Sequence, residues 1–268
     1  MELRELQLSE LKILSEFKRI CEENNLTYFL QAGTLLGAVR HGGFIPWDDD
    51  IDVSMPRSDY DRLALLCREK LGRGFFFQDS STDPCFPYCF SKIRRMGTEV
   101  YEEHLKNVRI HKGHYIDIFP LDVCPRNEFL ARLYFKSVTM VISAYMAKVN
   151  PDFVCGYRKK TARLMWRLLK RLSVEKLGRL RDRIAILPSA FGSSGRLCTV
   201  GGIHGYPAET YESEWFSNTV RMTFENMSFS APSGWNEILT HMYGDYMTPV
   251  DTEHREGHFV KMKEEDRE

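Results

Sequence analysis

Residues 47–53 read Trp-Asp-Asp-Asp-Ile-Asp-Val, and they constrain the fold more than any other stretch of the chain. Acidic and apolar residues alternate from Asp50 to Val53, a period-two pattern typical of a β-strand with one polar face. On such a strand Asp49 points to one face and the other three aspartates point to the opposite face. These three are Asp48, Asp50 and Asp52. The pattern predicts three like charges along one edge of a sheet.

A divalent cation is the natural partner of these aspartates, because neighbouring carboxylates repel and raise one another's pKa. Hard oxygen ligands favour Mg²⁺ or Mn²⁺. An EF-hand calcium loop that starts at Asp48 is excluded, because its sixth position is Val53 instead of glycine and its twelfth is Asp59 instead of glutamate. The apolar neighbours Ile45 and Trp47 also argue against a solvated acidic loop.

A strand, a glycine turn and a helix precede the aspartates. Residues 27–31 are expected to form the strand, and residues 34–40 the helix, which the Gly42–Gly43 pair would end. The N-terminus of such a helix offers free N–H groups and a positive dipole end to a phosphate. Gly33 and Thr34 are therefore candidates for a phosphate-binding turn.

Asp117 is the second acidic position of interest. It lies between two isoleucines in an apolar run, residues 115–119, that Pro120 is expected to end. Its carboxylate is predicted at the polar edge of the sheet, as a metal ligand or as a general base for an acceptor hydroxyl. Asp122 is the alternative base, and the strand context favours Asp117.

The rest of the chain alternates helical and strand patterns. Helices are expected at residues 3–23, 59–70 and 235–243, and further strands at 75–78, 89–94 and 221–229. This order predicts an α/β (α+β) fold with a mixed sheet flanked by helices. We expect three parts: a catalytic core at 1–126, a helical insertion at 127–188, and a segment at 189–268 that completes the core and the active site.

The insertion is strongly basic. Residues 157–183 contain eleven lysines and arginines and two acidic residues. One helical face carries leucines, and the other carries Arg163, Arg167, Lys170 and Arg171. The face is either a solvated outer surface or a surface for anionic lipid or a polyanionic acceptor.

Composition sets limits on partners and location. The chain has 268 residues with 37 basic and 37 acidic side chains, and no nucleic-acid partner is predicted. Seven scattered cysteines do not form a disulfide framework and indicate a reducing compartment. No signal peptide or membrane span is recognisable, so a cytoplasmic location is expected, with peripheral contact at the inner membrane face as a further expectation.

Several motifs together give the chain a family resemblance. Residues 33–41 read Gly-Thr-Leu-Leu-Gly-Ala-Val-Arg-His, and residues 43–52 read Gly-Phe-Ile-Pro-Trp-Asp-Asp-Asp-Ile-Asp. Further matching segments are 57–60, 92–94, 117–122 and 243–247, followed by Arg255 and His258. The chain resembles the LicD family, phosphorylcholine transferases related to fukutin, over residues 1–125 and 221–260.

This resemblance implies a nucleotidyltransferase fold whose glycine turn and Asp-x-Asp strand bind donor phosphates and magnesium. The implied metal ligands are Asp48, Asp50, Asp52 and Asp117, of which Asp50, Asp52 and Asp117 are the catalytic residues. The implied substrate-binding residues are Gly33, Thr34, Arg40, His41, Lys92, Arg94, Arg255 and His258. The tail departs from the family, because Pro249-Val250-Asp251 stands where a Pro-Pro pair is usual.

The resemblance also implies the reaction. We expect Mg²⁺-dependent transfer of a phospho-alcohol, phosphocholine from CDP-choline, to a sugar hydroxyl of a cell-surface glycan, a teichoic-acid precursor or a lipid-linked glycan, with release of CMP. Ethanolamine, ribitol and glycerol remain open as the alcohol. The alternatives are transfer of a nucleoside monophosphate from a nucleoside triphosphate to a hydroxyl, and an inactive module that binds nucleotide or membrane.

Overall fold

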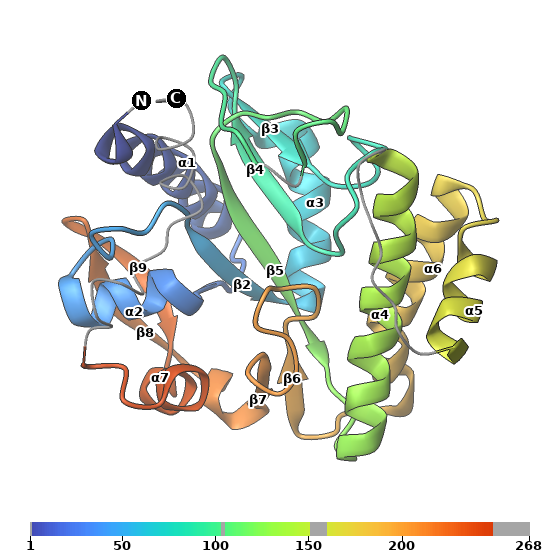
Figure 1. The fold of residues 1–268 in the computed structure, drawn as a ribbon. Coiled ribbons are helices and arrows are strands. Elements are labelled where there is room, and N and C mark those ends of the chain that lie inside the picture. Colours follow the sequence, from blue (N-terminus) through green and yellow to red (C-terminus); the bar gives the residue numbers. More distant parts are fainter. Residues whose placement is uncertain (1, 103–104, 151–159, 249–268) are drawn as a thin grey trace.

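The computed structural model describes residues 2–102, 105–150 and 160–248. Within these residues seven strands form one mixed sheet (Figure 1). Five follow the spatial order β1 (Phe29–Leu30), β2 (Asp52–Pro56), β5 (Tyr115–Val123), β4 (Ser91–Arg95) and β3 (Phe75–Gln78). β2 and β5 are parallel, and the other neighbours are antiparallel. The predicted mixed sheet is confirmed.

The remaining strands extend and flank this sheet. β6 (Arg196–Cys198) pairs with the last residues of β5, and β7 (Thr210–Glu212) pairs with β6. β8 (Thr219–Phe224) and β9 (Met227–Pro232) form a separate hairpin. The hairpin turns at Glu225 and Asn226, which both have a positive φ. The sequence predicts one strand here, because neither turn residue is glycine.

Helices cover the sheet and lie beside it. They are α1 (Leu3–Glu23), α2 (Ala32–His41), α3 (Arg57–Lys70), α4 (Glu128–Val149), α5 (Lys160–Leu169), α6 (Val174–Ile186) and α7 (Trp235–Tyr243), with short 3₁₀ helices at Leu187–Phe191 and Ser213–Phe216. α1 and α3 pack against each other and the sheet, and α4, α5 and α6 form a separate group at one side (Figure 1).

The main core lies between the sheet and the helices α1 and α3. The apolar face of α1 contributes Ile13, Phe17 and Ile20, each fully buried. Burial of one such side chain contributes about 1.5–3 kcal/mol of favourable transfer free energy. Ile116 and Ile118 of β5 point into this core, so the intervening Asp117 points to the other face of the sheet.

Two strand boundaries differ from the sequence prediction. β2 begins at Asp52 instead of Asp50, so the alternation rule does not apply to the three aspartates before it. β5 continues through Pro120 to Val123. Proline is tolerated there because β4 pairs with β5 only as far as Ile118 and β6 begins its pairing at Asp122.

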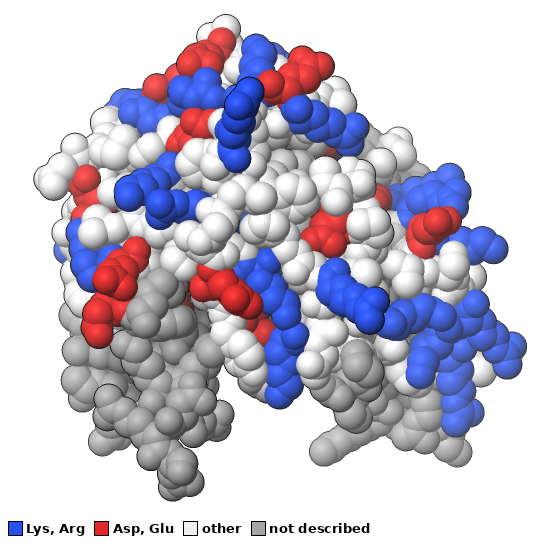
Figure 2. Space-filling model, turned by 90° about the horizontal axis from the view of Figure 1, so that it is seen from above, with Lys and Arg blue, Asp and Glu red and all other residues white. Residues whose placement is uncertain are grey.

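The described residues of the segment 127–187 form the helices α4, α5 and α6, as expected, but the amphipathic pattern is only partly as expected. Lysine and arginine side chains gather over the side of the molecule where α4, α5 and α6 lie (Figure 2). Arg181 is an exception, because it is 2% exposed and donates to Ser80 Oγ at 2.9 Å. Leu164 and Leu168 are exposed instead of buried. Among the described residues, no helix is long and apolar enough to cross a membrane.

Candidate active site

A row of charged residues crosses three neighbouring strands. Asp52 on β2 is the register partner of Asp117 on β5, and Asp117 is the partner of Lys92 on β4. All three line one cavity of about 510 Å³. Asp48 and Asp50 line the same cavity, so the structure brings together the four aspartates predicted as metal ligands.

The loop before β2 concentrates negative charge. Carboxylate oxygens of Asp48, Asp49 and Asp50 lie within 4.8 Å of one another. Asp49 does not line the cavity, so its side chain points away from the cavity as predicted. It does not point away from the other two carboxylates. Its carboxylate stays with those of its neighbours because this segment is a loop and the strand starts later.

Burial and mutual repulsion govern the ionisation of these groups. Burial raises the pKa of Asp52 well above its usual value, and the carboxylates of Asp50 and Asp117 raise it further. Burial also raises the pKa of Asp117, while the ammonium of Lys92 opposes this. A hard divalent cation fits this all-carboxylate donor set, because its charge would stabilise the ionised forms.

Glu10 adds a carboxylate from α1 that the sequence does not predict. Its side chain is 1% exposed, and Oε2 has no hydrogen-bond partner among the described residues. Burial raises the pKa of Glu10 well above its usual value, and Asp50 and Asp49 raise it further. Glu10 therefore lies near the acidic loop and adds to its repulsion.

α2 begins at Ala32 instead of residue 34, so Gly33 and Thr34, predicted as a turn before the helix, lie in its first turn. This first turn contacts the acidic loop. Gly33 lines the cavity, and a methyl group there would lie 2.8 Å from Asp48 Oδ2. Thr34 does not line the cavity, because its Oγ1 accepts a hydrogen bond from the backbone N–H of Asp52 at 2.8 Å. The turn therefore positions Asp48 and Asp52 directly, and Gly33 is the member that can face a phosphate.

The two basic residues predicted on β4 have different positions. Lys92 Nζ lies 3.0 Å from Asp117 Oδ1 and 3.2 Å from Glu102 Oε1, and it faces the cavity. Arg94 is fully buried and does not line the cavity. Its guanidinium donates to Gln78, to the carbonyl of Gly113 and to Glu102. Arg94 thus holds Glu102, and Lys92 is the candidate for contact with phosphate.

Arg40 and His41, at the end of α2, also differ in their position relative to the cavity. Arg40 lines the cavity and donates from Nη1 to the carbonyl of Tyr246 at 2.8 Å. Its Nε donates to His41 Nε2 at 3.0 Å, and His41 is not among the cavity-lining residues. Arg40 is therefore the member of this pair that can contact a substrate.

Asp122, the alternative base, is held in an ion pair. Its two carboxylate oxygens accept hydrogen bonds from Arg57 at 2.7 and 2.6 Å. It does not line the cavity. This geometry favours Asp117 as the carboxylate that can meet a substrate. Arg255 and His258 lie outside the described residues, although Thr248, shortly before them, does line the cavity.

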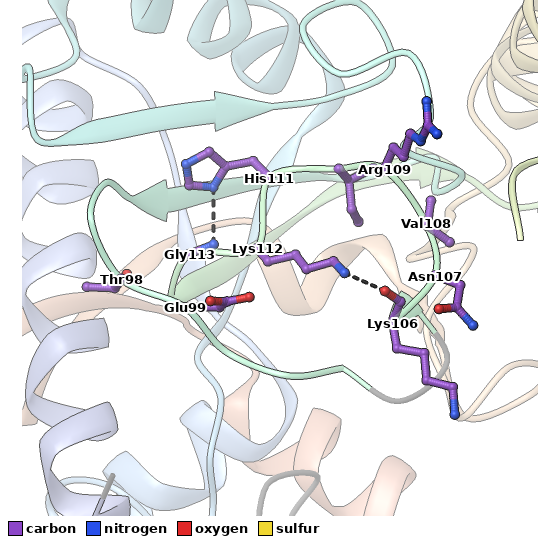
Figure 3. A pocket seen from close by; sticks show the side chains of 10 residues that line it. Thr98, Glu99, Lys106, Asn107, Val108, Arg109, His111, Lys112 and Gly113 are labelled. Carbon is purple, nitrogen blue, oxygen red and sulfur yellow. Dashed lines mark hydrogen bonds between the residues drawn. The ribbon is translucent and has the colours of Figure 1, made fainter.

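A second cavity, of about 480 Å³, lies within the connection from β4 to β5 (Figure 3). Figure 3 shows the ammonium of Lys112 directed at the carbonyl of Lys106, to which it donates a hydrogen bond. Gly113 N donates to His111 Nδ1. Lys112 thus stabilises the loop itself. Asp52 and Asp117 do not line this second cavity.

Several cavity residues are not predicted from the sequence. They are Glu102, Glu209, Tyr211 and Tyr243. Glu102 follows β4 in an irregular segment, and Glu209 lies in a loop after β6. Neither segment has a periodic pattern, so only the acidic character of the two residues gave a signal.

Comparison with known proteins agrees with this geometry. The model of the family described as LicD/FKTN/FKRP, nucleotidyltransferase domain, matches residues 25–135, which include β1 to β5 and the four aspartates predicted as metal ligands. The lipopolysaccharide cholinephosphotransferase LicD of Haemophilus influenzae is 27% identical over 272 residues, covering 97% of this chain and 96% of that protein.

The ribitol 5-phosphate transferase FKRP of Homo sapiens is 27% identical over 103 residues, which cover 37% of this chain and 21% of FKRP. An uncharacterized protein of Rickettsia prowazekii, RP689, is 42% identical over 59 residues, or 22% of each chain. Residues 25–135 thus match the nucleotidyltransferase domain of the LicD/FKTN/FKRP family, and the chain is similar over nearly its whole length to a LicD cholinephosphotransferase.

Proposed function

We propose that this protein transfers a phospho-alcohol group from a cytidine-diphosphate-linked donor to a sugar hydroxyl of a glycan. The donor is CDP-choline, the product that leaves is CMP, and the acceptor is a cell-surface glycan or a teichoic-acid or lipid-linked glycan precursor. The observation that carries the proposal is the convergence of Asp50, Asp52 and Asp117 on one cavity. The similarity to a cholinephosphotransferase over nearly the whole chain supports phosphocholine as the group.

The carboxylates of Asp48, Asp50, Asp52 and Asp117 would hold the cation, Mg²⁺ or Mn²⁺. Bound there, the ion supplies charge neutralisation for donor phosphate oxygens. Lys92 adds a positive charge beside Asp117. Gly33 leaves room for the Asp48 carboxylate, which any side chain there would meet, and it lies at the N-terminus of α2, where a phosphate can be bound.

Asp117 receives the proton of the acceptor hydroxyl in this proposal. The hydroxyl oxygen forms a bond to the distal phosphorus of the donor, and the bond from that phosphorus to the bridging oxygen breaks, so that CMP leaves with the electron pair. Asp117 can take this role because its carboxylate lines the cavity, whereas Asp122 does not. Lys92 orients the carboxylate through its contact of 3.0 Å with Oδ1.

Product analysis tests this function. The protein is incubated with Mg²⁺, a crude glycan acceptor and each CDP-alcohol in turn, and nucleotides are separated by chromatography. Metal-dependent and acceptor-dependent CMP supports the proposal. If no CDP-alcohol gives CMP and a nucleoside triphosphate gives pyrophosphate, the reaction is nucleotidyl transfer instead. If neither product forms, the chain is a binding module.

We also propose a cytoplasmic location in which the basic helical group contacts the inner face of an anionic membrane. The support is the gathering of lysine and arginine side chains over α4, α5 and α6 (Figure 2). Sedimentation with vesicles tests this idea. Binding should require anionic lipid and fall when Arg167, Lys170 and Arg171 are replaced by glutamine. Equal binding to neutral vesicles would contradict it.

A further inference from the structure

Glu209 places a buried carboxylate in the wall of the active-site cavity. The residue is 4% exposed and lines the cavity. Its Oε1 accepts a hydrogen bond from the backbone N–H of His204 at 3.1 Å, but Oε2 is buried with no hydrogen-bond partner among the described residues. A buried carboxylate without a compensating charge is costly. A cationic ligand group would remove this cost.

The loop from β6 to β7 is built closely around this carboxylate. A methyl group on Gly202 would lie 2.1 Å from Glu209 Oε1, so a side chain there would displace the carboxylate. The backbone N–H of Thr199 donates to the carbonyl of Glu209 at 3.2 Å, which closes the loop. The position of the carboxylate is therefore fixed by the backbone, as a binding group requires.

Aromatic rings lie beside Glu209 in the same wall. Tyr211 follows it by two residues, and both line the cavity. Tyr243 of α7 also lines the cavity, and its ring packs against that of His204 with centroids 5.8 Å apart. Burial raises the pKa of both tyrosines, so both phenols stay neutral. The faces of neutral tyrosine rings attract ammonium groups, most strongly when these are desolvated.

Hydrogen bonds connect this wall to the aspartate row. The hydroxyl of Tyr211 accepts a hydrogen bond from Gln31 Nε2 at 2.7 Å, and the backbone N–H of Gln31 donates to the carbonyl of Asp52 at 3.0 Å. After burial, Asp52 and Tyr211 are the groups that raise the pKa of Tyr243 most, so Tyr243 lies near both. Glu209 and the aspartates therefore belong to one connected cavity wall.

We propose that Glu209 is the specificity-determining residue for the transferred alcohol, and that its carboxylate forms with Tyr211 and Tyr243 a subsite for an ammonium head group. The inference rests on the proposed function, because the donor phosphates are taken to lie beside the aspartates. A neutral polyol would leave the carboxylate without a counter-charge. The subsite therefore selects a phosphorylated amino alcohol over phosphorylated ribitol or glycerol.

The test compares two donors that differ only in charge: CDP-choline and its uncharged carbon isostere, CDP-3,3-dimethylbutanol. Glu209→Gln keeps an oxygen acceptor for the His204 N–H and removes the charge. Glu212→Gln is the matched control, because Glu212 lies three residues further along the chain, on β7, and does not line the cavity. Binding is measured by calorimetry with Mg²⁺ present, and KM and kcat are measured from CMP release.

The wild type should bind CDP-choline about tenfold more tightly than the isostere, a preference that corresponds to about 1.4 kcal/mol. In Glu209→Gln the preference should disappear, KM for CDP-choline should rise about tenfold, and kcat should change little. Glu212→Gln should retain the preference. An equal preference in the wild type and Glu209→Gln would overturn the inference, as would tighter binding of CDP-ribitol than of CDP-choline by the wild type.

Calorimetry separates this inference from the proposed function. If the wild type releases no CMP from any donor, the proposed function fails, and the binding preference still decides the role of Glu209. If CMP is released equally from both donors and Glu209→Gln has no effect on binding, the function stands and the subsite is wrong.

Discussion

Asp52 and Asp117 are direct register partners on the adjacent parallel strands β2 and β5. They are 65 residues apart in sequence, yet the pairing places both carboxylates at the wall of one cavity. Asp117 in turn faces Lys92 on β4. This row gives the site its rigidity, because three hydrogen-bonded strands fix the spacing of its charges.

Neutralising either partner should abolish most of the transfer activity. Asp52→Asn and Asp117→Asn each remove one negative charge from the proposed cation site while the strand pairing stays intact. CMP release should fall by at least about 100-fold, the usual effect of losing one group that stabilises a transition state. Asp61→Asn, at an exposed position on α3, is the control. Activity within twofold of the wild type in Asp52→Asn would contradict the assigned role.

Gly33→Ala should weaken cation binding through Asp48. The added methyl group would lie 2.8 Å from Asp48 Oδ2, so the carboxylate must move. We expect about a tenfold loss of Mn²⁺ affinity, comparable to the loss of a group that orients a metal ligand. Titration followed by electron paramagnetic resonance measures this affinity. Gly74→Ala, where a methyl group meets nothing within 4 Å, should leave it unchanged.

Asp122→Asn should destabilise the fold without affecting the cation site. Asp122 is 3% exposed in its bidentate pair with Arg57, and its loss leaves the Arg57 charge poorly compensated. The free energy of unfolding should fall by roughly 3 kcal/mol, as for other broken buried pairs. Replacing Asp61, the exposed partner of the same arginine, should cost at most about 0.5 kcal/mol. Equal losses in the two variants, measured by urea denaturation, would refute the distinction.

Glu209 should make stability depend on pH. Burial raises its pKa from 4.5 to about 7 in the folded protein, so the folded state binds the proton more tightly than the unfolded state. The contribution of Glu209 to the free energy of unfolding is complete below about pH 4.5 and is lost as the pH rises through 7. This loss amounts to roughly 3 kcal/mol between pH 4.5 and pH 8. The Glu209→Gln variant has no carboxyl group to titrate at this position. The stability of the wild type relative to this variant should therefore fall as the pH rises from 4.5 to 8. A constant difference would show that the pKa is not raised.

The sequence predicts most of the elements that carry the aspartates. The periodicity of α1, the limits of β3 and the limits of α7 agree with the structure, because each has a strong apolar pattern or clear boundaries. β6 and β7 are three residues each and are too short to show a period. Tertiary pairing with β5 fixes them, and no local signal does.

The candidate site is predicted only in part for a similar reason. A motif marks residues whose local context is distinctive, such as Asp50 and Asp52 beside buried apolar residues. It does not show which basic residue reaches the cavity. Lys92 contacts Asp117, whereas Arg94 is held by Gln78 and the carbonyl of Gly113. Glu209 enters the wall because β7 pairs with β6, a contact between segments far from the motif.

The measurement that tests the central claim most directly is the transfer of labelled phosphocholine from CDP-choline to a glycan acceptor, before and after removal of divalent ions by chelation. We predict one CMP for each phosphocholine transferred, loss of both products after chelation, and recovery of both when Mg²⁺ or Mn²⁺ is restored. Transfer that persists in the absence of divalent ions, or in the Asp52→Asn variant, would contradict the account.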